Sequence, residues 1–374
     1  MISDSVLQAT SLNFAKKVVD WQKASGRLHL PWQNTLDPYR VWLSEIMLQQ
    51  TQVATVVQYY DRFLQRFPEV KDLAAASLDD VLALWSGLGY YSRARNMHRC
   101  AQQIIALHSG RFPASAVQLQ TLPGIGPSTA AAIAAFCFAE RVAILDGNVK
   151  RVLTRVLGFS GDLAQVARER ELWGFAAMLL PKPSAMMPAY TQGLMDIGAT
   201  VCTAKKPRCA CCPVRSVCKG LRSGKPEQYP VKTKKLKRSS EALSLLVAQK
   251  PDGSVWLERR PVAGIWGGLY CLPVFNSLDA ARAVLQLPHQ RIQILKSFKH
   301  VLTHKDLHLS PLLVEFPACR DMPSPPSTGL KQQAPGAWFN SAEWSALGLP
   351  APVRKLLQNK PHFDLTDLLH QSSR

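Results

Sequence analysis

Apolar residues recur with a helical period through the first half of the chain. Between residues 5 and 25, and again between 39 and 60, apolar side chains return every three or four positions, as in a helix with one buried face. Residues 129–139 form an apolar stretch that is long enough for a buried helix but too short to span a bilayer. A further helical period follows Asp146, and helices continue over 163–200. The pattern predicts a mostly helical first domain.

The pattern turns to strands in the second half of the chain. Segments 242–249 and 254–260 read as strands, and they flank Asp252 and Gly253, a strong hairpin signal. Residues 292–316 add further runs of β type. We therefore expect a second domain of mixed α and β structure.

The 374 residues are enough for two ordinary domains. We place the first at residues 1–218 and the second at 241–362. The segment between them, 219–240, is rich in Lys, Pro and Ser and poor in apolar residues. This composition predicts a basic linker.

The net charge favours a polyanionic partner. Lys and Arg number 45 and Asp and Glu 26, an excess of 45 − 26 = 19, which suits nucleic acid or an anionic membrane surface. No run of about 18 apolar residues occurs, and the N-terminal residues lack the apolar core of a signal peptide. We expect a cytoplasmic protein with no membrane partner. In that compartment nine unevenly placed cysteines favour a metal over a disulfide framework.

Residues 122–153 combine a glycine hairpin with two helix starts. Pro123, Gly124 and Gly126 predict a tight turn, after which Ser128 opens the apolar stretch. The two glycines leave backbone N–H groups uncovered at a helix N-terminus, where the orphan donors and the helix dipole favour an anion such as a DNA phosphate. The segment predicts a helix, a hairpin and a second helix.

Two carboxylates occupy positions that suit acid and charge chemistry. Three of the four helical neighbours of Glu45 are apolar, with Gln49 as the fourth, so the carboxyl should be desolvated and its pKa raised toward that of a general acid. An ordinary Glu turned to solvent is the alternative. Asp146 precedes a helical period, and an N-cap is its simplest role.

Four cysteines form a compact group. Cys202, Cys209, Cys212 and Cys218 have the spacing C-x6-C-x2-C-x5-C, which fits a zinc ribbon poorly because such ribbons pair two C-x2-C knuckles across a longer spacer. Cys211 and Cys212 are adjacent, so either could be the third ligand. We choose Cys212, because it keeps the C-x6-C-x2-C-x5-C spacing, and leave Cys211 out of the ligand set.

Together these features resemble the helix-hairpin-helix DNA glycosylases related to endonuclease III, and more narrowly the MutY adenine glycosylases. The resemblance rests on the strings LPGIGPSTA, DGNVKRV and SEIMLQQT, and on the cysteine spacing of a [4Fe-4S] loop. It implies a mostly α N-terminal helix-hairpin-helix glycosylase domain with an iron-sulfur loop at 202–218. It also implies an α+β, Nudix-like C-terminal domain.

The resemblance assigns the chemistry to named residues. It implies that Glu45 protonates adenine and that Asp146, held ionised at a helix terminus, stabilises the cationic sugar. Asn148 and Ser128 would position the sugar or its phosphates. Gln192 would face the extruded adenine, although a Gln that only satisfies a buried backbone group fits the sequence equally well.

The resemblance also assigns DNA contacts. An enzyme that acts on a stacked base must extrude it, and Gln49 and Tyr90 take over the family's wedge and intercalating positions. Gly124 and Gly126 would hold a phosphate through the hairpin, and Lys150 would contact the DNA.

Residues 260–273 resemble the C-terminal domain of MutY, which is similar to Nudix folds. A Nudix hydrolase needs an REx2EE helix, and residues 274–285 contain no such glutamate cluster, so we interpret the domain as a recognition module. The family's FSH loop corresponds to Leu302, Thr303 and His304. Thr keeps the hydroxyl of Ser, whereas Leu removes the aromatic face of Phe.

The resemblance implies a monomeric, monofunctional adenine DNA glycosylase of base excision repair with a [4Fe-4S] cofactor. It would hydrolyse the N-glycosidic bond of adenine opposite 8-oxoguanine or guanine in double-stranded DNA, and so prevent G:C to T:A transversions.

Three alternatives stay open. An endonuclease III-like pyrimidine glycosylase and AP lyase would need a lysine where Ser128 stands. A non-catalytic iron-sulfur DNA-binding protein would use Glu45 and Asp146 only structurally. A Nudix-type nucleotide hydrolase lacks its metal ligands.

Overall fold

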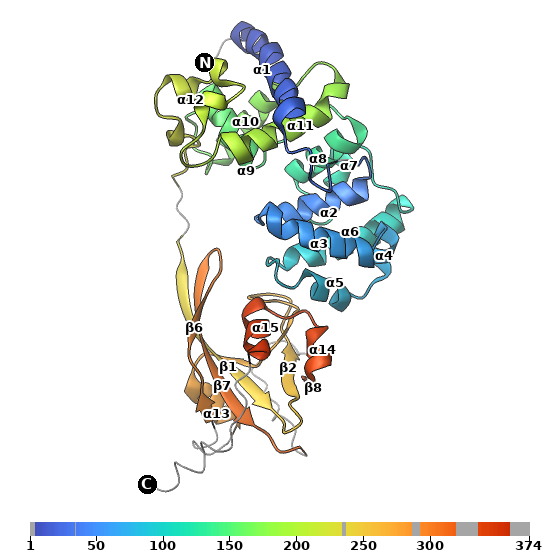
Figure 1. Cartoon of the computed structure of the whole chain (residues 1–374), viewed down its shortest axis with the longest axis vertical. Coiled ribbons are helices and arrows are strands. Elements are labelled where there is room, and N and C mark those ends of the chain that lie inside the picture. Colours follow the sequence, from blue (N-terminus) through green and yellow to red (C-terminus); the bar gives the residue numbers. More distant parts are fainter. Residues whose placement is uncertain (1–3, 34, 234–236, 286–291, 319–335, 360–374) are drawn as a thin grey trace. The chain divides into compact units, whose positions relative to one another are not determined.

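The computed structural model describes residues 4–33, 35–233, 237–285, 292–318 and 336–359 (Figure 1). Their contacts form two compact units, one of residues up to 75 with 96–233, the other of residues 76–95 with those from 237 on. The division of the chain falls inside the predicted linker, and 76–95 group with the second unit although they lie within the predicted first domain. The linker residues 234–236 and the last residues of the predicted second domain, 360–362, lie outside the described residues.

The first unit is helical, as the apolar periods predict. Its helices are α1 (Asp4–Ser25), α2 (Pro38–Leu48), α3 (Val53–Arg66), α4 (Val70–Ala75), α6 (Ser92–His108, whose first turn belongs to the second unit), α7 (Ala116–Leu119), α8 (Pro127–Phe138), α9 (Gly147–Leu157), α10 (Val166–Met178), α11 (Met187–Asp196) and α12 (Lys219–Arg222). Helix α12 shows that the beginning of the predicted linker segment is folded.

Local chemistry sets several of the helix ends. Asp37 caps α2 by accepting a hydrogen bond from the backbone N–H of Tyr39, and Pro38 occupies the first helical turn. Gly158 ends α9 with φ of 61°, the left-handed conformation that a residue without a Cβ adopts at little cost. Each of these signals is short-range, because it depends on one or two neighbouring residues.

The prediction of one helix over 39–60 is wrong. The structure has α2 and α3 there, separated by Gln49 to Gln52, where Gln50 has φ of 58°. A left-handed residue cannot continue a right-handed helix. Because of the break, Gln49 is the C-cap of α2, the helix that carries Glu45.

The core of the first unit fixes the helices that carry the predicted site. Helix α11 packs against α1, α8 and α9. Val149, Leu153, Tyr190 and Leu194 are all buried at this junction. Truncating one such Leu to Ala typically costs about 2–5 kcal/mol, so the packing holds α9 and α11 firmly in place.

The second unit is an α+β domain, as predicted. Its elements are α5 (Leu78–Trp85), β1 (Ser239–Gln249), β2 (Val255–Arg259), β3 (Tyr270–Cys271), β4 (Val274–Phe275), α13 (Leu278–Leu285), β5 (Ile292–Ile294), β6 (Phe298–Val301), β7 (Lys305–Glu315), β8 (Ala337–Phe339), α14 (Ser341–Ser345) and α15 (Ala351–Gln358).

The sheet is mixed, and its centre is a long parallel pair. Strands run in the order β3-β2-β1-β7-β5, with β4 on β1, β6 on β7 and β8 on β2. Figure 1 shows β1 and β7 side by side, in a register that pairs Leu243 with Leu309 and Val247 with Leu313. Residues 243–248 are buried on both faces of the sheet, which is why this strand reads as a continuous apolar run.

The predicted hairpin is confirmed, since β1 and β2 pair antiparallel around the turn at Asp252 and Gly253. The segment 274–285 forms β4 and α13, and α13 carries Asp279 as its acidic residue. Within the residues that the structure describes, no helix has the length and hydropathy needed to cross a bilayer.

Candidate functional site

A pocket of about 250 Å³ opens in the first unit next to Glu45. It brings together residues from the end of α1, the segment before α2, α2 itself, α8 and α11. The pocket is lined by both Glu45 and Gln192, although most of the unit's sequence lies between these two residues. The other lining residues are Gln22, Leu28, Trp32, Gln33, Thr35, Leu36, Val41, Ser44, Phe136, Pro188 and Ala189.

Glu45 is a carboxylic acid of strongly perturbed acidity. Protein atoms crowd its side chain, although it keeps some accessible surface because it lines the pocket. Burial, and after it the charge of Asp146, raises the pKa of Glu45 to about 8. A carboxyl with this pKa is mostly protonated near neutral pH and can act as a general acid.

Asp146 is both an N-cap and a second acidic group near Glu45. Its Oδ1 accepts a hydrogen bond of 2.7 Å from the backbone N–H of Val149, and its Oδ2 accepts one of 3.2 Å from Asn148 Nδ2. Burial raises the pKa of Asp146, while these hydrogen bonds and Arg151 oppose the rise. The predicted cap is confirmed, and its charge reaches Glu45.

Asn148 is fixed on both sides of its amide. It donates to Asp146, and its Oδ1 accepts a hydrogen bond of 2.8 Å from Arg151 Nη2. Gly198 packs so closely that an added Cβ would lie 2.6 Å from Asn148 Cβ. The orientation of Asn148 is therefore determined by its neighbours and by the absence of a side chain at Gly198.

Gln192 is held by a buried ion pair. Its Nε2 donates a hydrogen bond of 2.9 Å to Oδ1 of Asp196, which has no accessible surface. Arg27 pairs with the same carboxylate through a contact of 2.7 Å. The sequence places Asp196 near Gln192 but gives no hint of Arg27.

Gln33 is a pocket residue that sequence reasoning missed. Both polar atoms of its side-chain amide are buried, and neither has a hydrogen-bond partner among the described residues. Buried polar atoms are rarely left unpaired, and such an atom in a pocket indicates a missing ligand or water. In the sequence, the only feature that could have pointed to Gln33 is its place directly after Leu-Pro-Trp, since Trp32 also lines the pocket.

The glycine hairpin is built as predicted. Gly124 has φ of 79°, and Gly126 is the N-cap of α8. Both glycines are exposed, whereas Ser128 is half-buried in the first turn of the helix. Gln49 Nε2 donates a hydrogen bond of 3.3 Å to Thr129 Oγ1 in the next position of α8.

Lys150 lies on α9, and its Nζ forms an ion pair with Glu169. Its ammonium group therefore already has an anionic partner. Any contact with a DNA phosphate would have to share this lysine with Glu169 or replace that carboxylate.

The second unit has its own cavity, of about 740 Å³, next to Tyr90. Gly87 and Gly89 have positive φ, and Tyr90 itself is left-handed with φ of 47°. Its hydroxyl forms a hydrogen bond with Oγ1 of Thr303. Thr303 and His304 are exposed and line this cavity with Leu302.

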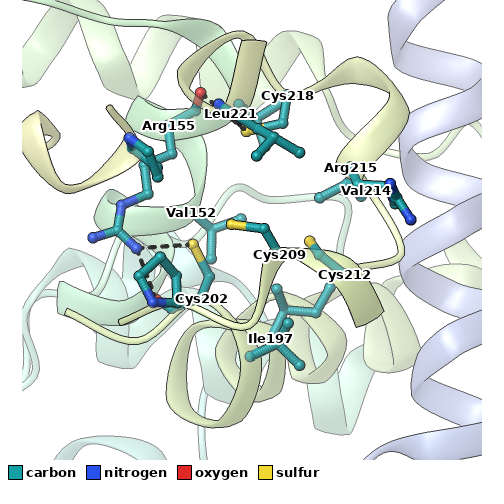
Figure 2. Close-up of a pocket in the computed structure, with 14 residues that line it drawn as sticks. Val152, Arg155, Ile197, Cys202, Cys209, Cys212, Val214, Arg215, Cys218 and Leu221 are labelled. Carbon is teal, nitrogen blue, oxygen red and sulfur yellow. Dashed lines mark hydrogen bonds between the residues drawn. The ribbon is translucent and has the colours of Figure 1, made fainter. Parts of the chain in front are cut away.

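The four predicted cysteine ligands surround one small cavity in the first unit (Figure 2). Cys211 is exposed and does not line it. Among the described residues, no three His, Cys, Asp or Glu side chains converge tightly enough to bind a single metal ion. In a [4Fe-4S] cube each thiolate binds a different iron, so the four sulfurs need to surround the cube rather than meet at one point.

The surroundings of the thiols fit such a group. Burial raises the pKa of Cys212 to about 12, so a metal would have to displace thiol protons on binding. Arg155, buried on α9, donates a hydrogen bond of 3.3 Å from Nη1 to Cys202 Sγ, drawn as a dashed line in Figure 2. The backbone N–H of Leu221 lies 3.4 Å from Cys218 Sγ. N–H donors to sulfur stabilise bound thiolates.

Two family models match the chain. Residues 43–178 match the HhH-GPD superfamily base excision DNA repair proteins, and residues 244–359 match the NUDIX domain. The first match includes Glu45 and Asp146 of the helical unit together with residues 76–95 of the second unit, and the second match lies in the α+β unit.

Curated relatives match most of the chain. An adenine DNA glycosylase of Buchnera aphidicola (from Acyrthosiphon pisum) is 38% identical over 355 residues, covering 94% of this chain and 98% of the relative. The mouse adenine DNA glycosylase is 33% identical over 354 residues, covering 78% and 68%. Among solved structures, a thermostable thymine-DNA glycosylase aligns at a TM-score of 0.51 and 26% identity, covering 57% of this chain and 98% of that one.

Proposed function

Because the chain belongs to the adenine DNA glycosylases, we propose that it removes adenine mispaired with 8-oxoguanine or guanine from double-stranded DNA. The reaction hydrolyses the N-glycosidic bond and leaves an abasic site for base excision repair. Repair of that site prevents G:C to T:A transversions. The chain acts as a monomer on duplex DNA.

Glu45 acts as the general acid. The main support for the proposal is that this carboxyl group lines a pocket and has its pKa raised to about 8. Adenine is a poor leaving group as an anion. Glu45 gives its proton to N7, so that the bond between C1′ and N9 breaks and the base leaves neutral. The pocket holds the extruded base beside this proton donor.

The charge step belongs to Asp146. As the base leaves, the sugar develops oxocarbenium character, and the carboxylate of Asp146 stabilises that cation. The two carboxyl groups are coupled, because a charged Asp146 favours the protonated form of Glu45. Water then adds to C1′, and its proton restores Glu45.

The outcome is hydrolysis alone, because Ser128 stands where the bifunctional relatives carry a lysine. A serine cannot form the Schiff base through which those enzymes cleave the strand. Ser128 and Asn148 position the sugar or its flanking phosphate.

The base is read by carboxamides. Gln192 and Gln33 both line the pocket, and an amide can pair with the donor and acceptor groups on a purine edge. Adenine would supply the partners that the buried amide atoms of Gln33 lack among the described residues.

Contacts outside the pocket hold the DNA. Gln49 acts as part of the wedge that distorts the DNA, and Tyr90 intercalates. The exposed Gly124 and Gly126 bind a phosphate at the start of α8. Lys150 contributes a basic contact from α9. Thr303 and His304 read the base opposite adenine.

Cys202, Cys209, Cys212 and Cys218 hold a [4Fe-4S] cluster. When bound, the cluster cross-links the loop through four thiolates and so adds folding free energy. The loop presents Lys205, Lys206 and Arg208 between its first two cysteines, and this basic segment contacts DNA phosphate.

Single-turnover base release tests the proposal. Duplexes carry adenine opposite 8-oxoguanine, guanine or thymine, and hot alkali then reveals abasic sites. We expect breaks in the adenine strand only after alkali, fastest opposite 8-oxoguanine and absent opposite thymine. Strand cleavage before alkali, with borohydride trapping on thymine glycol DNA, would favour the lyase. Tight binding without any alkali-labile site would leave a non-catalytic DNA-binding protein.

A further inference from the structure

Asp196 has no role in the proposed acid and charge steps, yet it is one of the most heavily engaged carboxylates of the first unit. It has no accessible surface. Its Oδ2 accepts a hydrogen bond of 2.9 Å from the backbone N–H of Arg27, and its Oδ1 accepts one of 2.7 Å from Arg27 Nε. Gly26 lies against the same carboxylate, since a Cβ there would be 3.2 Å from Oδ2 and only 2.5 Å from the backbone oxygen of Gln22. The carboxylate is thus fixed in position and orientation.

The remaining partner of this carboxylate is Gln192. A carboxylate paired with a guanidinium offers only acceptor atoms, so Gln192 must turn its amide nitrogen toward it. The contact from Nε2 to Oδ1 is the one hydrogen bond that the Gln192 side chain makes among the described residues. The opposite orientation would place two acceptors against each other, so Asp196 also fixes the direction of Oε1.

We propose that Asp196, held by Arg27, is a positioning residue that orients the Gln192 carboxamide so that the site accepts adenine and rejects 6-oxopurines. This inference rests on the proposed function. Adenine carries a hydrogen-bond donor at its exocyclic nitrogen, N6, whereas hypoxanthine and guanine carry an acceptor, O6. An Oε1 held in the pocket pairs with the donor and opposes the acceptor.

The same reasoning separates Gln192 from Gln33. Gln33 makes no hydrogen bond to a described residue through either amide atom, so no described residue fixes which of the two atoms faces the base. An amide whose direction is not fixed adds affinity without discrimination. The discrimination therefore comes from the amide whose direction is fixed by Asp196.

The test compares single-turnover base release from duplexes with adenine or hypoxanthine opposite 8-oxoguanine. Hypoxanthine keeps N7 for Glu45 and changes the edge that the amide reads. The readout is the rate constant for adenine divided by that for hypoxanthine. The intrinsic reactivities of the two bases contribute equally to this ratio in every variant, so a change in the ratio reports on the protein. Asp196→Asn should lower this ratio about tenfold, because an asparagine amide offers a donor or an acceptor and lets Gln192 turn.

Two further variants separate positioning from structure. Gln192→Met removes the oriented amide and should lower the ratio to a similar extent. In the double variant Asp196→Asn/Gln192→Met the ratio should fall no further than in Gln192→Met, since Asp196 acts through Gln192. Arg27→Lys keeps a cation beside Asp196 and should keep the ratio.

The outcomes are distinct. An Asp196→Asn protein that loses activity on both bases equally, or a double variant that loses more discrimination than Gln192→Met, would overturn the inference. If Asp196→Asn does not fold, the Gln192→Met variant provides the test. An unchanged adenine-to-hypoxanthine ratio in Gln192→Met would reject the inference. Absence of adenine release by the wild-type protein would instead refute the proposed function.

Discussion

The charge of Asp146 reaches Glu45 and, after burial, is the cause that raises the pKa of Glu45. Asp146 lies at the start of α9 and Glu45 in the last turn of α2, so the relative position of two helices contributes to the acidity of Glu45. The effect has a definite sign. Ionised Asp146 favours the protonated acid that the proposed reaction needs.

Base excision should therefore fall as the pH rises through about 8. The active form of Glu45 is the protonated one, and its carboxyl loses the proton near that pH. The single-turnover rate constant on A:8-oxoguanine duplexes, measured with saturating enzyme from pH 6 to 10, checks this. A rate that stays flat through pH 9 would contradict the acid role.

Glu45→Gln should lower the excision rate by about 100- to 10,000-fold, the usual contribution of a general acid, while duplex affinity stays within about threefold of the wild type. The variant should also melt at a higher temperature above pH 8. A carboxyl whose pKa is raised by folding stabilises the fold fully below its ordinary pKa of 4.5, and this stability is lost progressively as the pH rises to about 8, whereas Gln carries no buried charge. Thermal unfolding of both proteins at pH 4 and pH 9 measures the difference in melting temperature, which should nearly disappear at pH 4.

Asp146 carries two roles that substitutions separate. Asp146→Asn keeps an oxygen that can accept the hydrogen bond from the backbone N–H of Val149, so its stability should stay near that of the wild type while excision is lost. Asp146→Ala should lose excision and also about 1 kcal/mol of stability. Denaturant unfolding together with base release makes the comparison. Full activity in Asp146→Asn would remove the charge role.

The cysteine set predicts a matched pair of variants. Cys212→Ser should lower the iron content and the visible absorbance of the purified protein, because it removes a thiol that lines the cavity. Cys211→Ser, one position away and exposed, is the control and should leave both unchanged. Iron loss in Cys211→Ser with retention in Cys212→Ser would reverse the assignment.

Thr303→Val should narrow the preference for 8-oxoguanine over guanine opposite adenine by about tenfold. Valine has the shape of threonine without the hydroxyl that pairs with Tyr90 and that we assign to the opposite base. The measure is the ratio of excision rates on A:8-oxoguanine and A:G duplexes. The A:G rate itself serves as the internal control and should change little.

Most of the helices and strands could be predicted because their signals are local. The cap at Asp146, the turn glycines at 124 and 126 and the hairpin at Asp252 and Gly253 each depend on a few neighbouring residues. The break at Gln50 could not be predicted, because a left-handed Gln is tolerated only where tertiary contacts hold it. The family resemblance identified Glu45 as the general acid. The helical period alone does not decide between a buried acid and an ordinary Glu turned to solvent.

The parts of the site that escaped prediction depend on long-range pairing. Arg27 and Asp196 lie 169 positions apart, and no period connects them. Glu169 pairs with Lys150 from another helix, so a lysine assigned to DNA already has a partner in the structure. That the Gln33 amide has no hydrogen-bond partner among the described residues is visible only when the surrounding atoms are placed.

Helix α9 connects the cysteine loop to the carboxylate of Asp146. Asp146 caps one end of this helix, and Arg155 near the other end donates hydrogen bonds to the backbone oxygens of Thr203 and Ala204. Eleven residues of helix form a rigid rod about 16 Å long. The position of the Asp146 carboxylate is therefore tied, through one rigid element, to the folding of the segment that carries Thr203 and Ala204.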